Sequence, residues 1–468
     1  MRYISTRGAA SPVGFEQALL EGLAPDGGLY VPQTWPSFSR DEIAQFSGAD
    51  FSEVAATVIA KFAPGRFDLD QLRALAAASY ATFNHAQTVP LRQFGDEDWL
   101  MELYHGPTLA FKDVAMQFLG QLFNDVLNEQ DKRVTIIGAT SGDTGAAAIE
   151  AFRGQDRVDV FILHPEGRVS EVQRKIMTTV DDENIFNIAV DGTFDDCQSM
   201  VKALFGDRSF ANQFSLSGVN SINWVRLAVQ IVYYFTTSVA LGGPDKKFSF
   251  VAPTGNFGDI FAGYAAKNMG LPIDKLCIAV NDNDILHRAL TTGVYRPLGV
   301  KKTISPSMDI QVASNFERLV FEASDRDADI VKQFVGAVDG ASGATLPADI
   351  VSRITEDFIS ERVDEKETAD TIKAFWQSDE FLIDPHTAIG VAAMQKAREK
   401  GALSGDVVCL STAHPAKFPE AVEGACGQLP KLPSHFADLY EKPEKCLTAG
   451  NNIDEIKAVM RKHSRISG

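Results

Sequence analysis

The chain has 468 residues, of which 45 % are hydrophobic and 23 % are charged, which is ordinary for a globular protein. A chain of this length predicts two or three domains with large buried cores. Its formal net charge of −18 argues against a nucleic-acid partner and against docking on an anionic membrane, because both require Lys- and Arg-rich faces. A small anionic ligand held by local backbone dipoles remains compatible with this charge.

The cysteines are scattered and form no C-x-x-C, which predicts a reducing compartment and no disulfide framework: Cys197, Cys277, Cys409, Cys426 and Cys446. The first eight residues lack the apolar stretch of a signal peptide. The longest uncharged run, 227–243, carries polar residues and favours a buried helix over a membrane span. We therefore expect a cytoplasmic protein.

Residues 1–92 are expected to form a mostly helical N-terminal domain. Ser11 and Pro12 favour a helix over 11–23, since serine caps helices and proline suits their first position. A short strand over 29–31 follows, and residues 40–88 carry apolar residues at helical spacing.

From residue 95 the pattern alternates between strands and helices. The predicted strands are short and almost continuously apolar, as buried parallel strands are: 134–137, 158–163, 185–190, 248–251, 276–280 and 407–410. This alternation predicts an α/β fold with two open, mainly parallel sheets, in domains 93–245 and 246–468. Residues 299–380 show no convincing strand. Helices predicted there suggest an insertion or lid: 327–338, 347–362 and 366–376.

One strand-to-helix loop, Pro253-Thr254-Gly255-Asn256-Phe257-Gly258-Asp259, follows the strand 248–251. Its glycines and the helix N-terminus would direct several backbone N–H groups and the positive end of the helix dipole to one place. The loop predicts either a phosphate site without basic side chains or a plain turn in which Asp259 caps the helix. It is neither a Walker A loop nor G-x-G-x-x-G.

A second loop, Ala139-Thr140-Ser141-Gly142-Asp143-Thr144-Gly145, follows the strand 134–137 and opens another helix. The hydroxyls of Ser141 and Thr144, with the backbone donors, would suit a carboxylate or a phosphate. The alternative is a simple capping motif.

Lys112 stands at the start of an apolar helix, between Leu109-Ala110-Phe111 and Val114-Ala115-Met116. The helix dipole and burial both disfavour an ammonium group there and would lower the pKa of Lys112. A neutral amine is the form that a Schiff-base lysine needs. The alternative is a lysine whose stem covers apolar surface while its ammonium group reaches water.

A fourth segment, residues 410–418, places the hydroxyls of Ser411 and Thr412 at the carboxyl end of a strand, where open α/β sheets bind ligands. A cap and turn would explain it equally well. The eight dispersed histidines form no metal-binding pattern, so we expect no structural metal.

Together these loops resemble pyridoxal-phosphate enzymes of the tryptophan-synthase-β type and, more closely, the threonine synthase family. The residues that carry the resemblance are 105–113 (HGPTLAFKD), 141–145 (SGDTG), 253–259 (PTGNFGD) and 411–418 (STAHPAKF), supported by 3–8, 25–32 and 220–224. The match runs from residue 3 to about residue 418. The resemblance implies two sheet domains with a cofactor cleft between them.

The resemblance also implies pyridoxal 5′-phosphate as cofactor. Lys112 would hold it as a Schiff base and later carry protons, and Thr412 would bond its pyridine nitrogen. The phosphate cradle would consist of Gly255, Asn256, Phe257, Gly258 and Asp259. The substrate carboxylate and the cofactor's ring hydroxyl would lie near Ser141, Asp143 and Thr144. A carboxylate beside a phenolate is repulsive unless one of them keeps a proton, which bears on Asp143.

The implied reaction converts O-phospho-L-homoserine and water to L-threonine and phosphate, by γ-elimination of phosphate and addition of water at the β-carbon. The substrate phosphate then needs its own anion site, for which the candidates are Lys417, Arg226, His105 and Ser141. A monomer or weak homodimer is expected. The alternatives are a dehydratase of the same fold, a nucleotide-binding enzyme that uses the 253–259 loop, and an inert amino-acid-binding relative.

Overall fold

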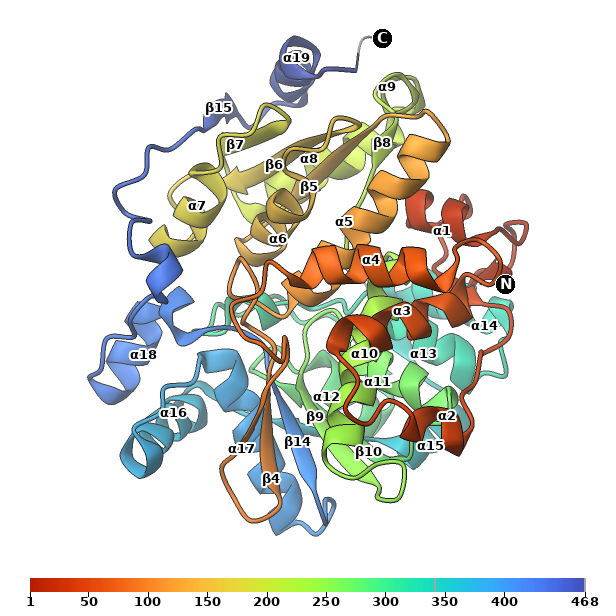
Figure 1. Ribbon diagram of the computed structural model, residues 1–468, viewed down its shortest axis with the longest axis vertical. Helices are drawn as coiled ribbons and strands as arrows, with labels where there is room; N and C mark the ends of the chain where they lie inside the picture. Colours follow the sequence, from red (N-terminus) through yellow and green to blue (C-terminus); the bar gives the residue numbers. More distant parts are fainter. Residues whose placement is uncertain (341, 467–468) are drawn as a thin grey trace.

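The computed structural model describes residues 1–340 and 342–466 (Figure 1). Its N-terminal region is mostly helical, as predicted, and consists of β1 (Tyr3–Ser5), α1 (Phe15–Glu21), β2 (Tyr30–Pro32), α2 (Arg40–Ala44), α3 (Phe51–Phe62) and α4 (Leu69–Tyr80). The predicted helix over 11–23 is wrong at its start. Val13 exchanges two backbone hydrogen bonds with Tyr3, both 2.9 Å, so α1 begins only at Phe15.

A five-stranded parallel sheet follows, in the order β15-β7-β6-β5-β8. Its strands are β5 (Val134–Ala139), β6 (Val158–Pro165), β7 (Ile185–Asp191), β8 (Leu216–Ser217) and β15 (Leu447–Gly450). The accompanying helices are α5 (Lys112–Glu129), α6 (Asp143–Phe152), α7 (Glu171–Thr178), α8 (Phe194–Gly206) and α9 (Arg208–Gln213). Every residue of β6 is buried, which explains why the strand is apolar except at Asp159 and His164.

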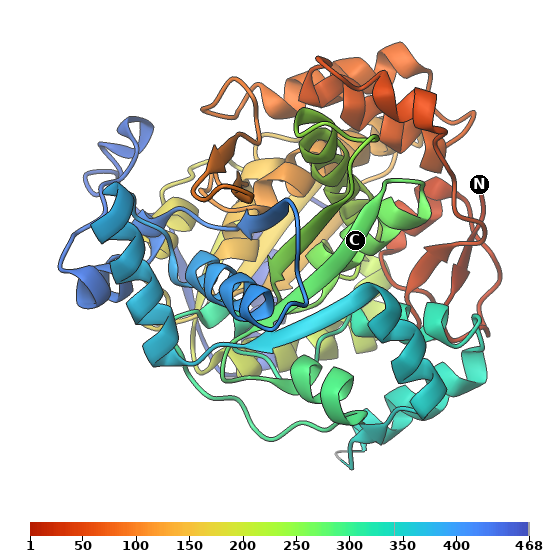
Figure 2. The same cartoon turned by 90° about the horizontal axis from the view of Figure 1, so that it is seen from below.

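The second sheet has six strands in the order β13-β10-β9-β14-β4-β3, and within it only the β3–β4 pair is antiparallel. Its strands are β3 (Leu91–Gln93), β4 (Asp98–Glu102), β9 (Phe248–Pro253), β10 (Ile273–Val280), β13 (Phe358–Arg362) and β14 (Val407–Ser411). Its helices include α10 (Trp224–Ala240), α11 (Gly258–Asn268), α12 (Ile285–Thr292) and α17 (Pro385–Glu399). Figure 2 shows α17 lying across one face of this sheet.

All six predicted strands are therefore confirmed, and so is the α/β class with mainly parallel sheets. The buried helix predicted for the uncharged run 227–243 is confirmed as α10, which covers the run up to Ala240. Among the described residues, no helix is both long enough and apolar enough to span a membrane.

The prediction of a strand-free region over 299–380 is wrong. The predicted helix 347–362 ends at Asp357, and Phe358–Arg362 form β13, which pairs in parallel with β10. This pairing satisfies backbone groups along the edge of β10, and it overrides the local helical pattern. β11 (Val294–Tyr295) precedes this region, whose remaining elements are η1 (Pro306–Met308), α13 (Phe316–Ala323), α14 (Ala328–Asp339), β12 (Ala344–Thr345), α15 (Ala348–Asp357) and α16 (Glu365–Asp379).

The C-terminal segment returns to the first sheet (Figure 1). After η2 (Pro415–Lys417), α18 (Pro419–Cys426) and η3 (Ser434–Phe436), the chain adds β15 beside β7 and ends in α19 (Ile453–His463). Two strands from before residue 245, β3 and β4, belong to the second sheet, and β15 from after it belongs to the first. The sheets thus exchange segments across the expected boundaries at residues 92 and 245.

Candidate functional site

Residues from both sheets meet at the N-terminus of α5. Lys112 is the first residue of α5, Asp143 is the first of α6, and Lys417 follows β14. The Nζ of Lys112 lies 3.2 Å from Oδ2 of Asp143, and the Nζ of Lys417 lies 2.6 Å from Oδ1. The structure therefore joins two residues that the sequence singled out for separate roles, Lys112 and Asp143, through one buried ion-pair cluster.

The three charged groups of this cluster are almost wholly removed from water: Lys112 is 9 % exposed, Asp143 5 % and Lys417 0 %. Burial lowers the pKa of Lys112; the charge of Asp143 opposes this shift, whereas the charges of Lys417 and Arg226 add to it. Burial alone would raise the pKa of Asp143, but the ammonium groups of Lys112 and Lys417 hold it well below its usual range. Asp143 is thus ionised, and it supplies the counter-charge for the two buried lysines.

Two further side chains fix Asp143. Gln173 Nε2 of α7 donates to Oδ1 at 2.8 Å, and Ser307 Oγ of η1 donates to Oδ2 at 3.1 Å. The preceding Gly142 has φ +138°, and a Cβ there would lie 2.6 Å from the Gln173 side chain. Both the backbone conformation and the close approach therefore require glycine at this position.

The loop before Lys112 is paired with the loop after β14. Phe111 N donates to Thr412 O at 2.9 Å, His414 N donates to Leu109 O at 3.0 Å, and Lys417 Nζ donates to Thr108 O at 2.8 Å. These bonds place buried Thr412 beside the start of α5.

The 253–259 loop presents a set of free donors. Within the described part of the chain, no acceptor is paired with the backbone N–H groups of residues 255–258. Phe257, the N-cap of α11, has φ +64°, and a Cβ on Gly255 would lie 2.7 Å from Ser307 O. Free N–H groups at the positive end of a helix suit a phosphate, so these residues fit the phosphate of the implied cofactor.

Asp259 does not cap α11, contrary to one alternative, because it is the second residue of that helix. Its Oδ1 is hydrogen-bonded to the Tyr233 hydroxyl of α10, and its Oδ2 has no partner among the described residues. Burial raises the pKa of Asp259 to about 7. Below that pH the carboxyl is neutral and does not repel an anion bound to the loop.

The remaining candidate residues differ in their exposure and in the partners that they already bond. Ser141 is exposed and Thr144 half-buried at the N-terminus of α6. His105 Nε2 lies 2.8 Å from Glu102 Oε2. Arg226 is 3 % exposed, and its Nη1 donates to Val219 O at 3.0 Å. No carboxylate pairs with Arg226 among the described residues, and burial lowers its pKa to about 10.

Sequence reasoning missed three residues of this site: Gln173, Ser307 and His386. The Nε2 of buried His386 lies 3.2 Å from Ser307 N, and its Nδ1 lies 2.6 Å from Asp384 Oδ2. Asp384 is the N-cap of α17, and a cap gives no sign in the sequence that the histidine two residues later bonds a distant loop.

The chain is similar to known proteins along most of its length. Three family models match the chain: Threonine synthase N terminus over residues 2–80, Pyridoxal-phosphate dependent enzyme over 86–339, and Threonine synthase, C-terminal over 387–460. A threonine synthase of Pseudomonas aeruginosa is 48 % identical over 464 residues, covering 99 % of this chain and 98 % of that protein.

Solved structures show the same likeness. A PLP-bound threonine synthase from Brucella melitensis superposes with a TM-score of 0.96 at 49 % identity, covering 99 % of this chain and 100 % of that one. The threonine synthase from yeast superposes with a TM-score of 0.93 at 39 % identity, covering 99 % and 98 %.

Proposed function

The chain belongs to the threonine synthase family, and on that premise we propose which of its residues convert O-phospho-L-homoserine and water to L-threonine and phosphate. The family resemblance inferred from the loops is confirmed, and the protein is a pyridoxal-phosphate-dependent lyase. One observation carries the assignment of the site: a buried lysine of lowered pKa stands at a helix start, paired with an ionised aspartate.

We assign Lys112 as the residue that holds the cofactor and carries protons at its Nζ. When bound, pyridoxal phosphate supplies an electron sink for the negative charge that develops on substrate carbons. Burial lowers the pKa of Lys112, which is the direction that a proton-accepting amine requires. Asp143 and Lys417 keep this amine oriented.

The cofactor phosphate is assigned to the free N–H groups of the loop comprising Gly255, Asn256, Phe257, Gly258 and Asp259. The support is electrostatic, because the helix dipole is positive there and Asp259 is neutral up to about pH 7. Thr412 is assigned to the pyridine nitrogen, since the Phe111–Thr412 backbone bond holds this buried, hydroxyl-bearing residue beside the start of α5.

Ser141 and Thr144 are assigned to the substrate carboxylate, at the N-terminus of α6. Asp143 lies in the same turn, but its carboxylate would repel that of the substrate. Its contribution is therefore to hold Lys112 and Lys417 in place.

Arg226 is the favoured partner for the substrate phosphate among the candidates. Lys417 is neutralised by Asp143, and His105 is bonded to Glu102, whereas Arg226 has no carboxylate partner among the described residues. Arg226→Leu is then expected to raise KM for O-phosphohomoserine more than it weakens cofactor binding. The reverse pattern would assign Arg226 to the cofactor phosphate instead.

The deciding experiment is phosphate release and threonine formation from O-phosphohomoserine by the purified protein. A visible cofactor band that borohydride collapses is expected. Turnover of unphosphorylated threonine or serine without phosphate release would favour the dehydratase alternative. The cytoplasmic location, the monomer or weak homodimer and the absence of nucleic-acid or membrane partners stay predictions.

A further inference from the structure

Residues 303–309 form a segment that lies on the proposed site. Its residue Ser307 makes three contacts there: Oγ donates to Asp143 Oδ2 at 3.1 Å, N donates to His386 Nε2 at 3.2 Å, and O stands 2.7 Å from where a Cβ on Gly255 would be. One residue thus touches the aspartate that pairs with Lys112 and the loop assigned to the cofactor phosphate.

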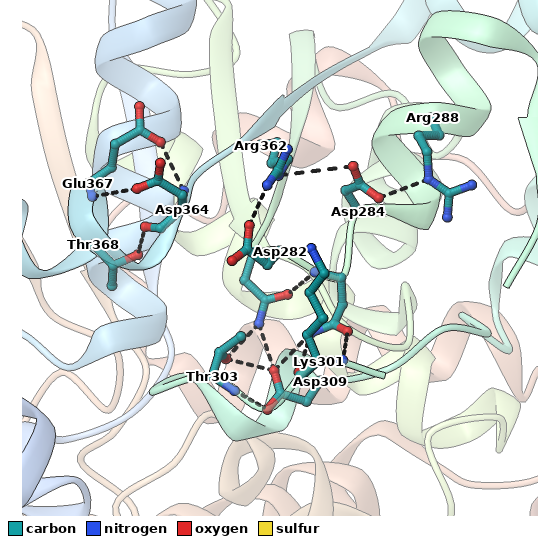
Figure 3. Close-up of polar contacts among 12 residues, drawn as sticks. Asp282, Asp284, Arg288, Lys301, Thr303, Asp309, Arg362, Asp364, Glu367 and Thr368 are labelled. Carbon is teal, nitrogen blue, oxygen red and sulfur yellow. Dashed lines mark hydrogen bonds and ion pairs between the residues drawn. The ribbon is translucent and has the colours of Figure 1, made fainter. Parts of the chain in front are cut away.

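Thr303 and Asp309, at the two ends of this segment, form its base, and they are held by bonds that do not involve Ser307 at its tip. Asp309 accepts hydrogen bonds from Thr303 N at 2.8 Å and Thr303 Oγ1 at 2.6 Å, and from the amides of Asn281 and Asn283 at 2.9 and 3.0 Å. Both asparagines follow β10. Figure 3 shows the contacts of Asp309 with Thr303 near the pairing of Arg362 with Asp282. The position of Ser307 therefore depends on what holds the tip.

The tip is held by His386, whose protonation is set by its partners. Asp384 has only acceptor oxygens when ionised, so the Nδ1 of His386 carries the proton in their 2.6 Å contact. The backbone N–H of Ser307 can only donate, so Nε2 must present its lone pair. His386 is 3 % exposed and lies 4.9 Å from the Phe418 ring centroid, which limits its rotation.

We propose that His386 is a positioning residue for this enzyme: held by Asp384, it accepts the Ser307 N–H and keeps residues 306–308 closed on Gly255 and Asp143. The effect is to order the phosphate loop and the Asp143 side chain before substrate binds. The proposal rests on the assignment of Gly255 and Asp143 to the site.

A pair of amide variants tests this proposal in the holoenzyme. In His386→Asn the side chain amide is close to the Nδ1 position, so it can bond Asp384 but cannot reach Ser307. In His386→Gln the longer side chain offers an acceptor near the Nε2 position. The matched control is His287→Asn, because His287 bonds Ser360 Oγ and, within the described part of the chain, forms no side-chain hydrogen bond with residues 303–309.

The first readout is hydrogen exchange of peptides covering 303–309, and the second is the dissociation constant of pyridoxal phosphate followed by visible absorbance. His386→Asn is expected to speed exchange in these peptides by about tenfold, as loss of one hydrogen bond does, and to weaken cofactor binding several-fold. His386→Gln is expected to restore both values, and His287→Asn to change neither.

Unchanged exchange at 303–309 in His386→Asn would overturn the proposal, and so would faster exchange spread equally over all peptides. Failure of His386→Gln to restore either value would also overturn it. If the wild-type protein bound no pyridoxal phosphate and released no phosphate from O-phosphohomoserine, the proposed function would fail instead. The exchange result would still report on the His386–Ser307 bond.

Discussion

The loop after β5 and the loop after β9 are built alike, but the aspartate of the first is ionised and that of the second is neutral below about pH 7. Each joins a parallel strand to a helix, contains glycine, and places an aspartate in the first helical turn: Asp143 in α6 and Asp259 in α11. Burial disfavours the charge of both carboxyls. Even so, the pKa of Asp143 lies well below its usual range, whereas that of Asp259 is raised to about 7.

The difference comes from what each carboxyl faces. Asp143 lies within 3.2 Å of two ammonium groups, but Asp259 meets the hydroxyl of Tyr233 and no cation among the described residues. One loop therefore supplies a negative charge to a lysine cluster. The other keeps its positive helix terminus free for a phosphate. The same local architecture serves two electrostatic purposes, and the distant partners decide which.

Replacing Lys112 by alanine tests the first loop and should have the largest effect. The change removes the amine assigned to the cofactor and to proton transfer, so kcat should fall by roughly 10²–10⁴-fold. The loss of a cation should also raise the pKa of Asp143. Phosphate release measures the first effect. Borohydride reduction followed by peptide mass analysis should label Lys112 in the wild type only.

Lys175→Ala is the matched control, because Lys175 is equally buried but bonds Tyr440 O, away from Asp143. Near-wild-type turnover in Lys112→Ala would contradict the assignment.

Asp143→Asn should have the next largest effect. It leaves Lys112 and Lys417 buried without their counter-charge, at a cost of roughly 3–5 kcal/mol in the free energy of unfolding. Because folding lowers the pKa of Asp143, its stabilisation is complete above its ordinary value of 3.8 and is lost as the pH falls through the folded value. Urea unfolding should therefore show the full deficit at pH 7 and a smaller one in acid. An equal loss of unfolding free energy at both pH values would mean that the loss does not come from the charge of Asp143.

Much of this architecture follows from local pattern. The central strands were predictable because strands buried on both faces are almost continuously apolar, as in the run 160–163 of β6. The site loops were recognisable because ligands of open sheets lie at the carboxyl ends of strands. By contrast, residues 358–362 continue a helical pattern in the sequence, and only their pairing with β10 gives them strand character. The short β3 and β15 lie at sheet edges and lack an apolar run of their own.

The charge states of the loops could not be predicted in the same way. Asp143 and Asp259 each look like a helix cap in the sequence, and the groups that shift their pKa values come from distant segments, such as Lys417 and Tyr233. Ser307 lies 164 residues from Asp143 along the chain. Such contacts are products of tertiary packing and leave no trace in local spacing.

Gly255→Ala tests the shape of the second loop and should have an intermediate effect. A Cβ would stand 2.7 Å from the Ser307 carbonyl oxygen, so either the loop or residues 306–308 must move. Such overpacking costs about 1–3 kcal/mol, which predicts cofactor binding weaker by about tenfold. Titration of the apoenzyme with pyridoxal phosphate measures this constant. In the control, Gly336→Ala, the added Cβ meets no described residue within 4 Å beyond its own helix, and affinity should not change. Wild-type affinity in Gly255→Ala would show that the contact with Ser307 is not needed.

Asp259→Asn should have the smallest effect on cofactor affinity below pH 7 and the clearest dependence of stability on pH. Folding raises the pKa of Asp259 from 3.8 to about 7, so its contribution to stability is complete below pH 4 and is lost as the pH rises through about 7. Between these values the wild type should lose up to about 1.4 kcal/mol per pH unit relative to Asp259→Asn, which has no proton to release.

Cofactor binding should follow the same course, because an ionised Asp259 puts a negative charge beside the phosphate loop. The ratio of wild-type to Asp259→Asn affinity for pyridoxal phosphate should fall from pH 6 to pH 8.5, and taking the ratio cancels the ionisation of the cofactor itself. If the ratio stayed constant, Asp259 would not titrate in this range. The contrast with Asp143 would then rest on the placement of the two carboxyl groups and not on their charge.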